Sequence, residues 1–137
     1  PLGLRDGINQ RLEVVEGVLS AQRPAHLPPL QVLLQINISQ EQSKSGIAAD
    51  EMLTLAKAVS QLPALSLVGL MAIPAPGDSE RAFAKMQQLS ATLQQIYPQA
   101  TELSMGMSDD WPLALRYGAT MIRLGTAIFG AREYKQE

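Results

Sequence analysis

The sequence predicts an α/β fold in which parallel strands alternate with helices, as in a doubly wound sheet or a βα barrel. Short apolar runs alternate with amphipathic helical stripes, and the connections between them are brief. The runs are apolar at most positions, as expected for strands buried on both faces. With 137 residues and 46% hydrophobic content, the chain is sufficient for one packed domain.

The expected elements follow this alternation along the chain. A helix is predicted over residues 7–21, where apolar side chains recur every three or four positions, and a proline-rich connector follows over residues 25–29. Strands are predicted at residues 30–38, 65–73, 101–105 and 120–124. Helices are predicted at residues 51–62, from Asp78 or Ser79 as the cap to about Tyr97, and at residues 111–117.

Composition argues against several classes of partner. The 11 basic and 13 acidic residues give a net charge of -2 and are scattered, so neither nucleic acid nor a membrane surface is expected to bind. Cysteine is absent, and no apolar run approaches the roughly 20 residues that span a bilayer. We therefore expect a cytoplasmic protein. Because the chain begins with Pro1 and not methionine, we also expect the start of the gene product to lie elsewhere.

Two loops have the composition of a phosphate site. The first is Gly106-Met107-Ser108, after the third predicted strand, and the second is Arg123-Leu124-Gly125-Thr126, at the end of the fourth. In βα barrels the loops after the last two strands often bind phosphate through backbone amides and hydroxyl groups. The alternative is that both glycines serve turns and that Ser108 and Thr126 cap helices. Because the two loops lie at the ends of adjacent strands, their position favours binding of one anion by both loops.

Longer motifs carry a resemblance. In chain order they are Gln35-Ile36-Asn37-Ile38, Ser43-Lys44-Ser45-Gly46, Gly69-Leu70-Met71-Ala72-Ile73-Pro74, Leu103-Ser104-Met105-Gly106-Met107-Ser108-Asp109-Asp110 and Arg123-Leu124-Gly125-Thr126-Ala127-Ile128-Phe129-Gly130. This set resembles the pyridoxal-phosphate homeostasis protein family over residues 22–133, a match far more specific than any one short pattern.

The resemblance implies a barrel like that of the alanine racemase N-terminal domain, which binds pyridoxal 5′-phosphate and buffers or delivers it without an established turnover reaction. It places Ser108, Gly125 and Thr126 against the phosphate and Arg123 toward the pyridine ring. The remaining cofactor-binding residues that it implies are Gly106, Met107, Asn37 and Lys44. A full-length family member is expected to be monomeric.

The sequence also departs from the family. The family holds the cofactor as a Schiff base through a lysine in a segment close to Ala-Val-Ser-Lys, which does not occur here. We therefore interpret residues 22–137 as the second half of a (β/α)8 barrel that lacks this lysine, preceded by a helical segment, residues 1–21, with no clear match. Lys44, in the loop after the first strand, is either a substitute anchor or a surface residue.

Two other functions remain open: an amino-acid racemase-like enzyme, or a structural half barrel that self-associates or needs a partner. The missing lysine and the lack of an acid–base partner argue against catalysis by this chain alone. Metal chemistry is also not expected. His26, the single histidine, has no second ligand nearby, and the adjacent Asp109 and Asp110 are expected to point in different directions at a helix start.

Overall fold

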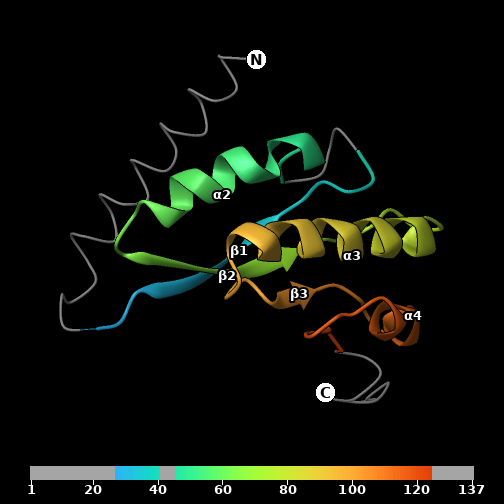
Figure 1. Cartoon of the computed structure of the whole chain (residues 1–137). Coiled ribbons are helices and arrows are strands. Elements are labelled where there is room, and N and C mark those ends of the chain that lie inside the picture. Colours follow the sequence, from blue (N-terminus) through green and yellow to red (C-terminus); the bar gives the residue numbers. More distant parts are fainter. Residues whose placement is uncertain (1–26, 41–45, 125–137) are drawn as a thin grey trace.

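A parallel sheet forms the centre of the structure, a computed structural model that describes residues 27–40 and 46–124 (Figure 1). Its strands are β1 (Leu30–Gln35), β2 (Leu65–Met71) and β3 (Glu102–Ser104), in the order β1-β2-β3. Each lies within a predicted strand but ends one to three residues earlier than expected. The α/β class with parallel strands is therefore confirmed. The predicted helix at residues 7–21 lies outside the described residues. Residues 25 and 26 of the predicted connector at residues 25–29 also lie outside them.

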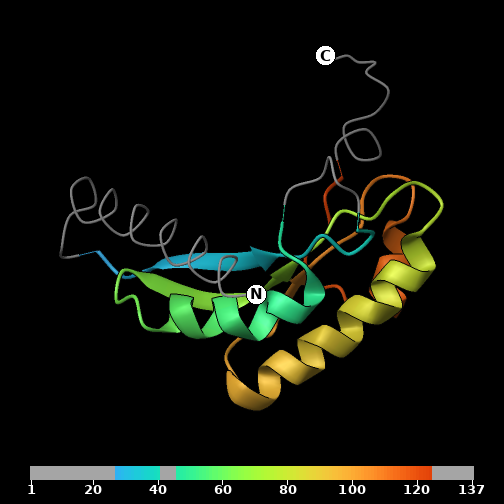
Figure 2. The ribbon, with the colours of Figure 1, turned by 90° about the horizontal axis from the view of Figure 1, so that it is seen from above.

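The helices show which α/β architecture is present. They are the 3₁₀ turn η1 (Ala49–Glu51), α2 (Met52–Ser60), α3 (Ser79–Ile96) and α4 (Trp111–Arg116). Figures 1 and 2 show α2 and α3 on the same side of the sheet. Right-handed crossovers between sequentially adjacent parallel strands place helices on one face, as in a barrel, whereas a doubly wound sheet carries helices on both faces. No helix in the described residues is long and apolar enough to cross a membrane.

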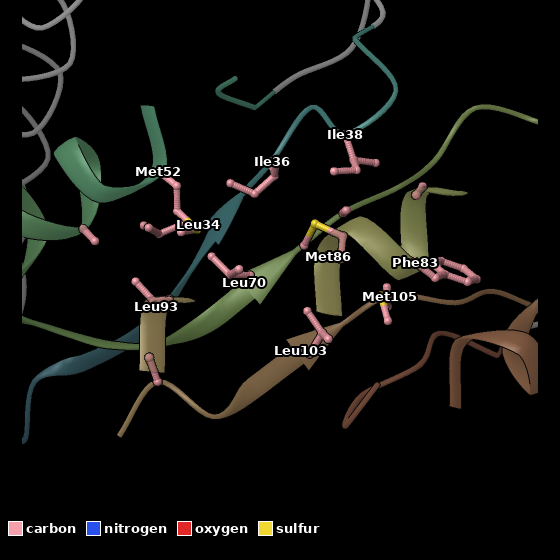
Figure 3. Close-up of a cluster of buried hydrophobic side chains, with 14 of the residues drawn as sticks. Leu34, Ile36, Ile38, Met52, Leu70, Phe83, Met86, Leu93, Leu103 and Met105 are labelled. Atoms are coloured by element: carbon pink, nitrogen blue, oxygen red, sulfur yellow. The ribbon is translucent and has the colours of Figure 1, made fainter. Parts of the chain in front are cut away.

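The hydrophobic core fills the space between the sheet and these helices (Figure 3). Alternate residues of β1 and its extension, Leu34, Ile36 and Ile38, are buried there. The largest fully buried side chains are Phe83, Ile36, Met52, Leu70, Met86, Leu93 and Met105. The intervening residues Gln35 and Asn37 are only half-buried. The prediction that the strands are buried on both faces is therefore wrong for β1, because its alternating polar side chains belong to the face opposite the helices.

Strand β2 approaches β3 so closely that one position must be glycine. Gly69 is paired with Glu102, and a Cβ atom on Gly69 would overlap with the carbonyl oxygen of Glu102. The pairing of β1 with β2 is irregular just before this point, because Val32 pairs with Leu67 while Leu33 pairs with Gly69. The glycine thus permits the close pairing of β2 with β3, and the register between β1 and β2 shifts beside it.

The fourth predicted strand, residues 120–124, is reduced to one parallel bridge between Ser104 and Met121 among the described residues. The segment is extended beside β3: the Thr120 amide donates to the Leu103 carbonyl at 2.9 Å, and the Met105 amide donates to the Met121 carbonyl at 3.1 Å. Because β3 itself has three residues, a long ladder cannot form against it. The segment still takes the next place in the sheet order.

Candidate functional site

The candidate site lies where the chain leaves β3 and where it returns beside β3 after α4 (Figure 1). The Arg123 amide donates to the Gly106 carbonyl at 3.0 Å, next to the Ser104–Met121 bridge. Parallel strands bring their carboxyl ends to the same edge of a sheet. The structure thus brings Gly106 and Arg123 together at that edge, although they are far apart in the sequence.

Within the described part of the chain, the guanidinium of Arg123 has one paired and one unpaired donor atom. Its Nη1 atom donates to the hydroxyl of Ser104 at 3.2 Å, and Ser104 is itself buried. Its Nη2 atom is buried and has no hydrogen-bond partner among the described residues. Buried unpaired donors are rare and cost about 1–3 kcal/mol. A ring nitrogen or an anionic oxygen of a ligand would supply the missing acceptor, so the residues present fit a group such as pyridoxal phosphate.

Gly106 is required by packing as well as by its backbone angle. Its φ of +103° lies in the left-handed region, which favours glycine. A Cβ atom here would lie 2.7 Å from the Cβ of Ala114 and 3.1 Å from Cγ2 of Ile122. The sequence analysis assigned this glycine to a loop that binds phosphate or, alternatively, to a turn. The structure gives it a different immediate role, the close seating of α4 and of the returning segment.

Met107 and Ser108 follow this glycine. They differ in whether their hydrogen-bonding groups already have a partner within the described residues. The Met107 amide donates to Oδ1 of Asp110 at 2.7 Å, so it is already paired within the protein. Ser108 is exposed, and its hydroxyl makes no hydrogen bond within the described part of the chain. Of the two, Ser108 offers the free donor.

Asn37 occupies a different position from these residues. It lies at the carboxyl end of β1, whereas Gly106 and Arg123 lie beyond β2, next to β3. Its amide donates to the Ile47 carbonyl at 2.8 Å, and it borders a hollow of about 720 Å³ that Arg81 and Lys85 also line.

That hollow is lined by none of the candidate residues Gly106, Met107, Ser108 and Arg123. Lys44, Gly125 and Thr126 lie outside the described residues. The structure therefore brings the loop that begins at Gly106 next to Arg123 and places Asn37 apart from them, beyond the end of β1. The positions of Lys44, Gly125 and Thr126 stay predictions.

A cluster around Asp78 was missed by sequence reasoning, which assigned Asp78 or Ser79 as a helix cap. Asp78 is the residue before α3, but its side chain makes no capping hydrogen bond. Arg81 donates to it through Nε at 2.8 Å and Nη2 at 2.6 Å, and the Ser39 hydroxyl donates to Oδ2 at 2.8 Å. The hydrogen bonds from Arg81, and then from Ser39, lower the pKa of Asp78 from 3.8 to about 2. The three-residue spacing of Asp78 and Arg81 was the available signal.

Comparison with known proteins gives a consistent family. Residues 10–133 match the family model described as Alanine racemase, N-terminal domain. The chain is 58% identical over 122 residues to the pyridoxal phosphate homeostasis protein of Haemophilus influenzae, covering 85% of this chain and 52% of that protein. It is 56% identical over 124 residues to the protein of the same name from Escherichia coli strain K12, covering 87% and 53%. The predicted resemblance is confirmed.

Solved structures agree on the fold. PipY of Synechococcus elongatus PCC7942, in a structure with PLP bound, is 35% identical with a TM-score of 0.66, covering 88% of this chain and 55% of PipY. A structure described as that of an unknown protein from Bifidobacterium adolescentis is 31% identical with a TM-score of 0.69, covering 94% of this chain and 50% of that one. The chain thus spans about half the length of the relatives it matches. The predicted fold class, part of a βα barrel, is confirmed.

Proposed function

Because the chain belongs to the alanine racemase N-terminal domain family, we propose that it binds pyridoxal 5′-phosphate and takes part in the homeostasis of this cofactor. The observation that carries the proposal is the buried Nη2 of Arg123, which has no hydrogen-bond partner among the described residues. This atom belongs to Arg123, whose backbone amide donates to the Gly106 carbonyl. The chain is also 58% identical to a protein named for this cofactor. A ligand acceptor beside β3 would pair that donor.

The phosphate end of the site is assigned to the loops after β3 and beyond Arg123. In the proposal the exposed Ser108 hydroxyl, with Gly125 and Thr126, binds the phosphate, while Gly106 and Met107 shape the loop. Asn37 and Lys44 complete the set from the loop after β1. Support for Ser108 comes from its free hydroxyl, and support for the two glycine loops comes from the hydrogen bond between Gly106 and Arg123.

Arg123 is assigned to the pyridine ring. Bound pyridoxal phosphate supplies an aldehyde that reacts with amines and a ring that withdraws electrons when its nitrogen is protonated. A guanidinium remains protonated at all physiological pH values, so it donates to the ring nitrogen and keeps that nitrogen unprotonated. The ring then withdraws electrons weakly. This suits a protein that carries the cofactor better than one that turns substrates over.

Binding by this chain is expected to be weak and reversible, because the lysine segment that anchors the cofactor in the family does not occur in it. The proposal places this binding in the cytoplasm, and cell fractionation tests that placement. Lys44 as a substitute anchor is tested separately by borohydride trapping and peptide mapping, where the absence of label on Lys44 would exclude it.

Calorimetric titration with pyridoxal 5′-phosphate and with pyridoxine 5′-phosphate tests the proposal. The second compound has an alcohol in place of the aldehyde, so it measures non-covalent binding without reaction at surface lysines. The Arg123→Gln variant removes the guanidinium and should weaken binding about tenfold or more, the typical loss for a hydrogen bond to a charged group. Ser108→Ala should weaken phosphate-dependent binding by a smaller factor.

Arg116→Gln is the matched control, because it removes the same charge from an exposed position in the last turn of α4. It should change the affinity by less than a factor of about two, as expected for an exposed, screened charge. If Arg123→Gln and Arg116→Gln had equal effects, or if neither compound bound at millimolar concentration, the proposed function would be wrong. A tight complex would contradict the expected weak binding.

A further inference from the structure

The carboxylate of Asp110 lies between the loop after β3 and the start of α3. Its Oδ1 atom accepts the Met107 amide at 2.7 Å, and its Oδ2 atom accepts the hydroxyl of Ser79 at 2.8 Å. The carbonyl of Met107 is held in turn, because the amides of Asp110 and Trp111 donate to it at 3.2 and 2.9 Å. Both polar groups of the Met107 backbone are therefore fixed, directly before Ser108.

These contacts continue across the carboxyl ends of the strands. Ser79, which donates to Asp110, is the first residue of α3 and directly follows Asp78. Asp78 accepts the hydroxyl of Ser39, and that same hydroxyl oxygen accepts the amide of Ala75 at 2.8 Å. We call Ser39, Asp78, Ser79 and Asp110 the loop belt. It ties together the loops that follow β1, β2 and β3.

We infer that Asp110, held by Ser79, is a positioning residue: it fixes the Met107 backbone so that the Ser108 hydroxyl is presented to a bound phosphate. The inference rests on the proposed function, since it concerns the same site. Asp110 itself does not touch the phosphate in this assignment. It acts in two ways. It accepts the Met107 amide, so that this amide does not donate to the ligand, and it fixes the conformation of the loop.

The charge of Asp110 provides a test of this inference. A purely electrostatic effect of its carboxylate on phosphate affinity has the opposite sign to a positioning effect. A carboxylate beside an anion site repels a phosphate, so removing it for reasons of charge alone should strengthen binding. Removing a positioning group should weaken binding, because the loop must then be ordered at the moment of binding. Phosphate affinity after truncation of Asp110 therefore separates the two roles.

Asp109 is the matched control. It is the adjacent residue, carries the same charge and is exposed. Its carboxylate takes part in no hydrogen bond within residues 27–40 and 46–124. The change Asp109→Ala thus alters the charge near the loop and leaves the loop belt intact. A second comparison is Asp110→Asn, whose side-chain oxygen still accepts the Met107 amide and whose amide group can donate to the Ser79 oxygen.

The experiment measures the binding of inorganic phosphate and of pyridoxine 5′-phosphate to the full chain by calorimetry. Asp110→Ala should weaken both by about tenfold and Ser79→Ala by about threefold, the range expected for lost neutral or charged hydrogen bonds. Asp110→Asn should stay within about threefold of the wild type, and Asp109→Ala should be unchanged or slightly tighter. Equal or tighter binding by folded Asp110→Ala would overturn the inference.

A readout without ligand tests the effect of Asp110 on the loop apart from binding. Amide exchange of Met107, followed by NMR, should accelerate in Asp110→Ala and Ser79→Ala but not in Asp109→Ala. If the wild type bound neither probe, the proposed function would fail, and the positioning role would fail with it whatever the exchange rates. If the wild type bound and the variants matched it, only Asp110's role would be refuted. Should Asp110→Ala not fold, Ser79→Ala decides: unchanged affinity and exchange would refute it.

Discussion

Gly106 and Gly77 show how the same residue type serves different physical needs. Both have positive φ angles, +103° and +82°, so both backbones disfavour other side chains. A Cβ on Gly77 would meet nothing within 4 Å, whereas a Cβ on Gly106 would press on Ala114 and Ile122. The sequence shows that Gly106 ends a strand and begins a loop. It does not show that α4 packs against it, because that neighbour comes from another element.

We predict that Gly106→Ala destabilises the chain more than Gly77→Ala does. Both variants carry the strain of the left-handed backbone, about 1–2 kcal/mol. Gly106→Ala adds overpacking, which typically costs a further 1–3 kcal/mol or so. Urea unfolding of the two variants and the wild type measures the difference. Equal free energies of unfolding would mean that α4 moves away freely, and that Gly106 does not seat it.

At the scale of elements, helix and strand positions follow from periodicity, but their ends do not. The predicted strand at residues 30–38 ends as a strand at Gln35, and the one at residues 120–124 forms a single bridge. Strand ends depend on how many partner residues are available, which is a property of the neighbour. The start of α3 is similar: Asp78 is at the cap position, but a local contact with Arg81 and a long-range contact with Ser39 occupy its carboxylate.

The cluster around Asp78 predicts a pH dependence for the junction between β1 and α3. Its pKa falls from 3.8 to about 2 in the folded chain, chiefly through the hydrogen bond from Arg81. A lowered carboxyl pKa contributes stability that is complete above the unfolded value and is lost as the pH falls toward the folded value. We expect Asp78→Asn to be less stable than the wild type at pH 7.

That difference should shrink between about pH 4 and pH 2, the interval set by the two pKa values. Urea unfolding of both proteins across this range measures it, and salt should weaken it because the pair is partly exposed. Asp109→Asn, an exposed carboxylate with no hydrogen bond in the described residues, controls for general charge effects. A difference that stayed constant down to pH 2 would argue against the assigned pKa.

For the whole molecule, the described sheet leaves apolar surface near one edge. Among the described residues β1 pairs as a strand only with β2, and Leu27 and Leu30 near its start are 42% and 40% exposed. Exposed strand edges favour pairing with other chains. The chain spans about half the length of its relatives, so the hypothesis of a half barrel that self-associates belongs to this scale.

We therefore predict concentration-dependent self-association that Leu30→Lys reduces, because a charged side chain at an edge strand opposes pairing. Sedimentation equilibrium measures the effect. Leu115→Lys is the control, since Leu115 is 49% exposed but lies on α4, away from β1. A wild-type chain that remained monomeric at every concentration, or equal effects of the two lysines, would refute a role for this edge.

Local pattern alone determined the α/β class, the order of the elements and the loops that are candidates for phosphate binding, because side-chain periodicity and turn residues act within a few positions. The ordered motifs also determined the family. Periodicity by itself left a doubly wound sheet and a barrel open, and the motifs implied the barrel. The tertiary structure supports the barrel, since it shows which face of the sheet the helices cover. It also showed an Arg123 donor without a partner among the described residues, the hydrogen bond from Arg123 to Ser104, and the hydrogen bond from the Met107 amide to Asp110. Those depend on contacts between distant residues, which no local pattern encodes.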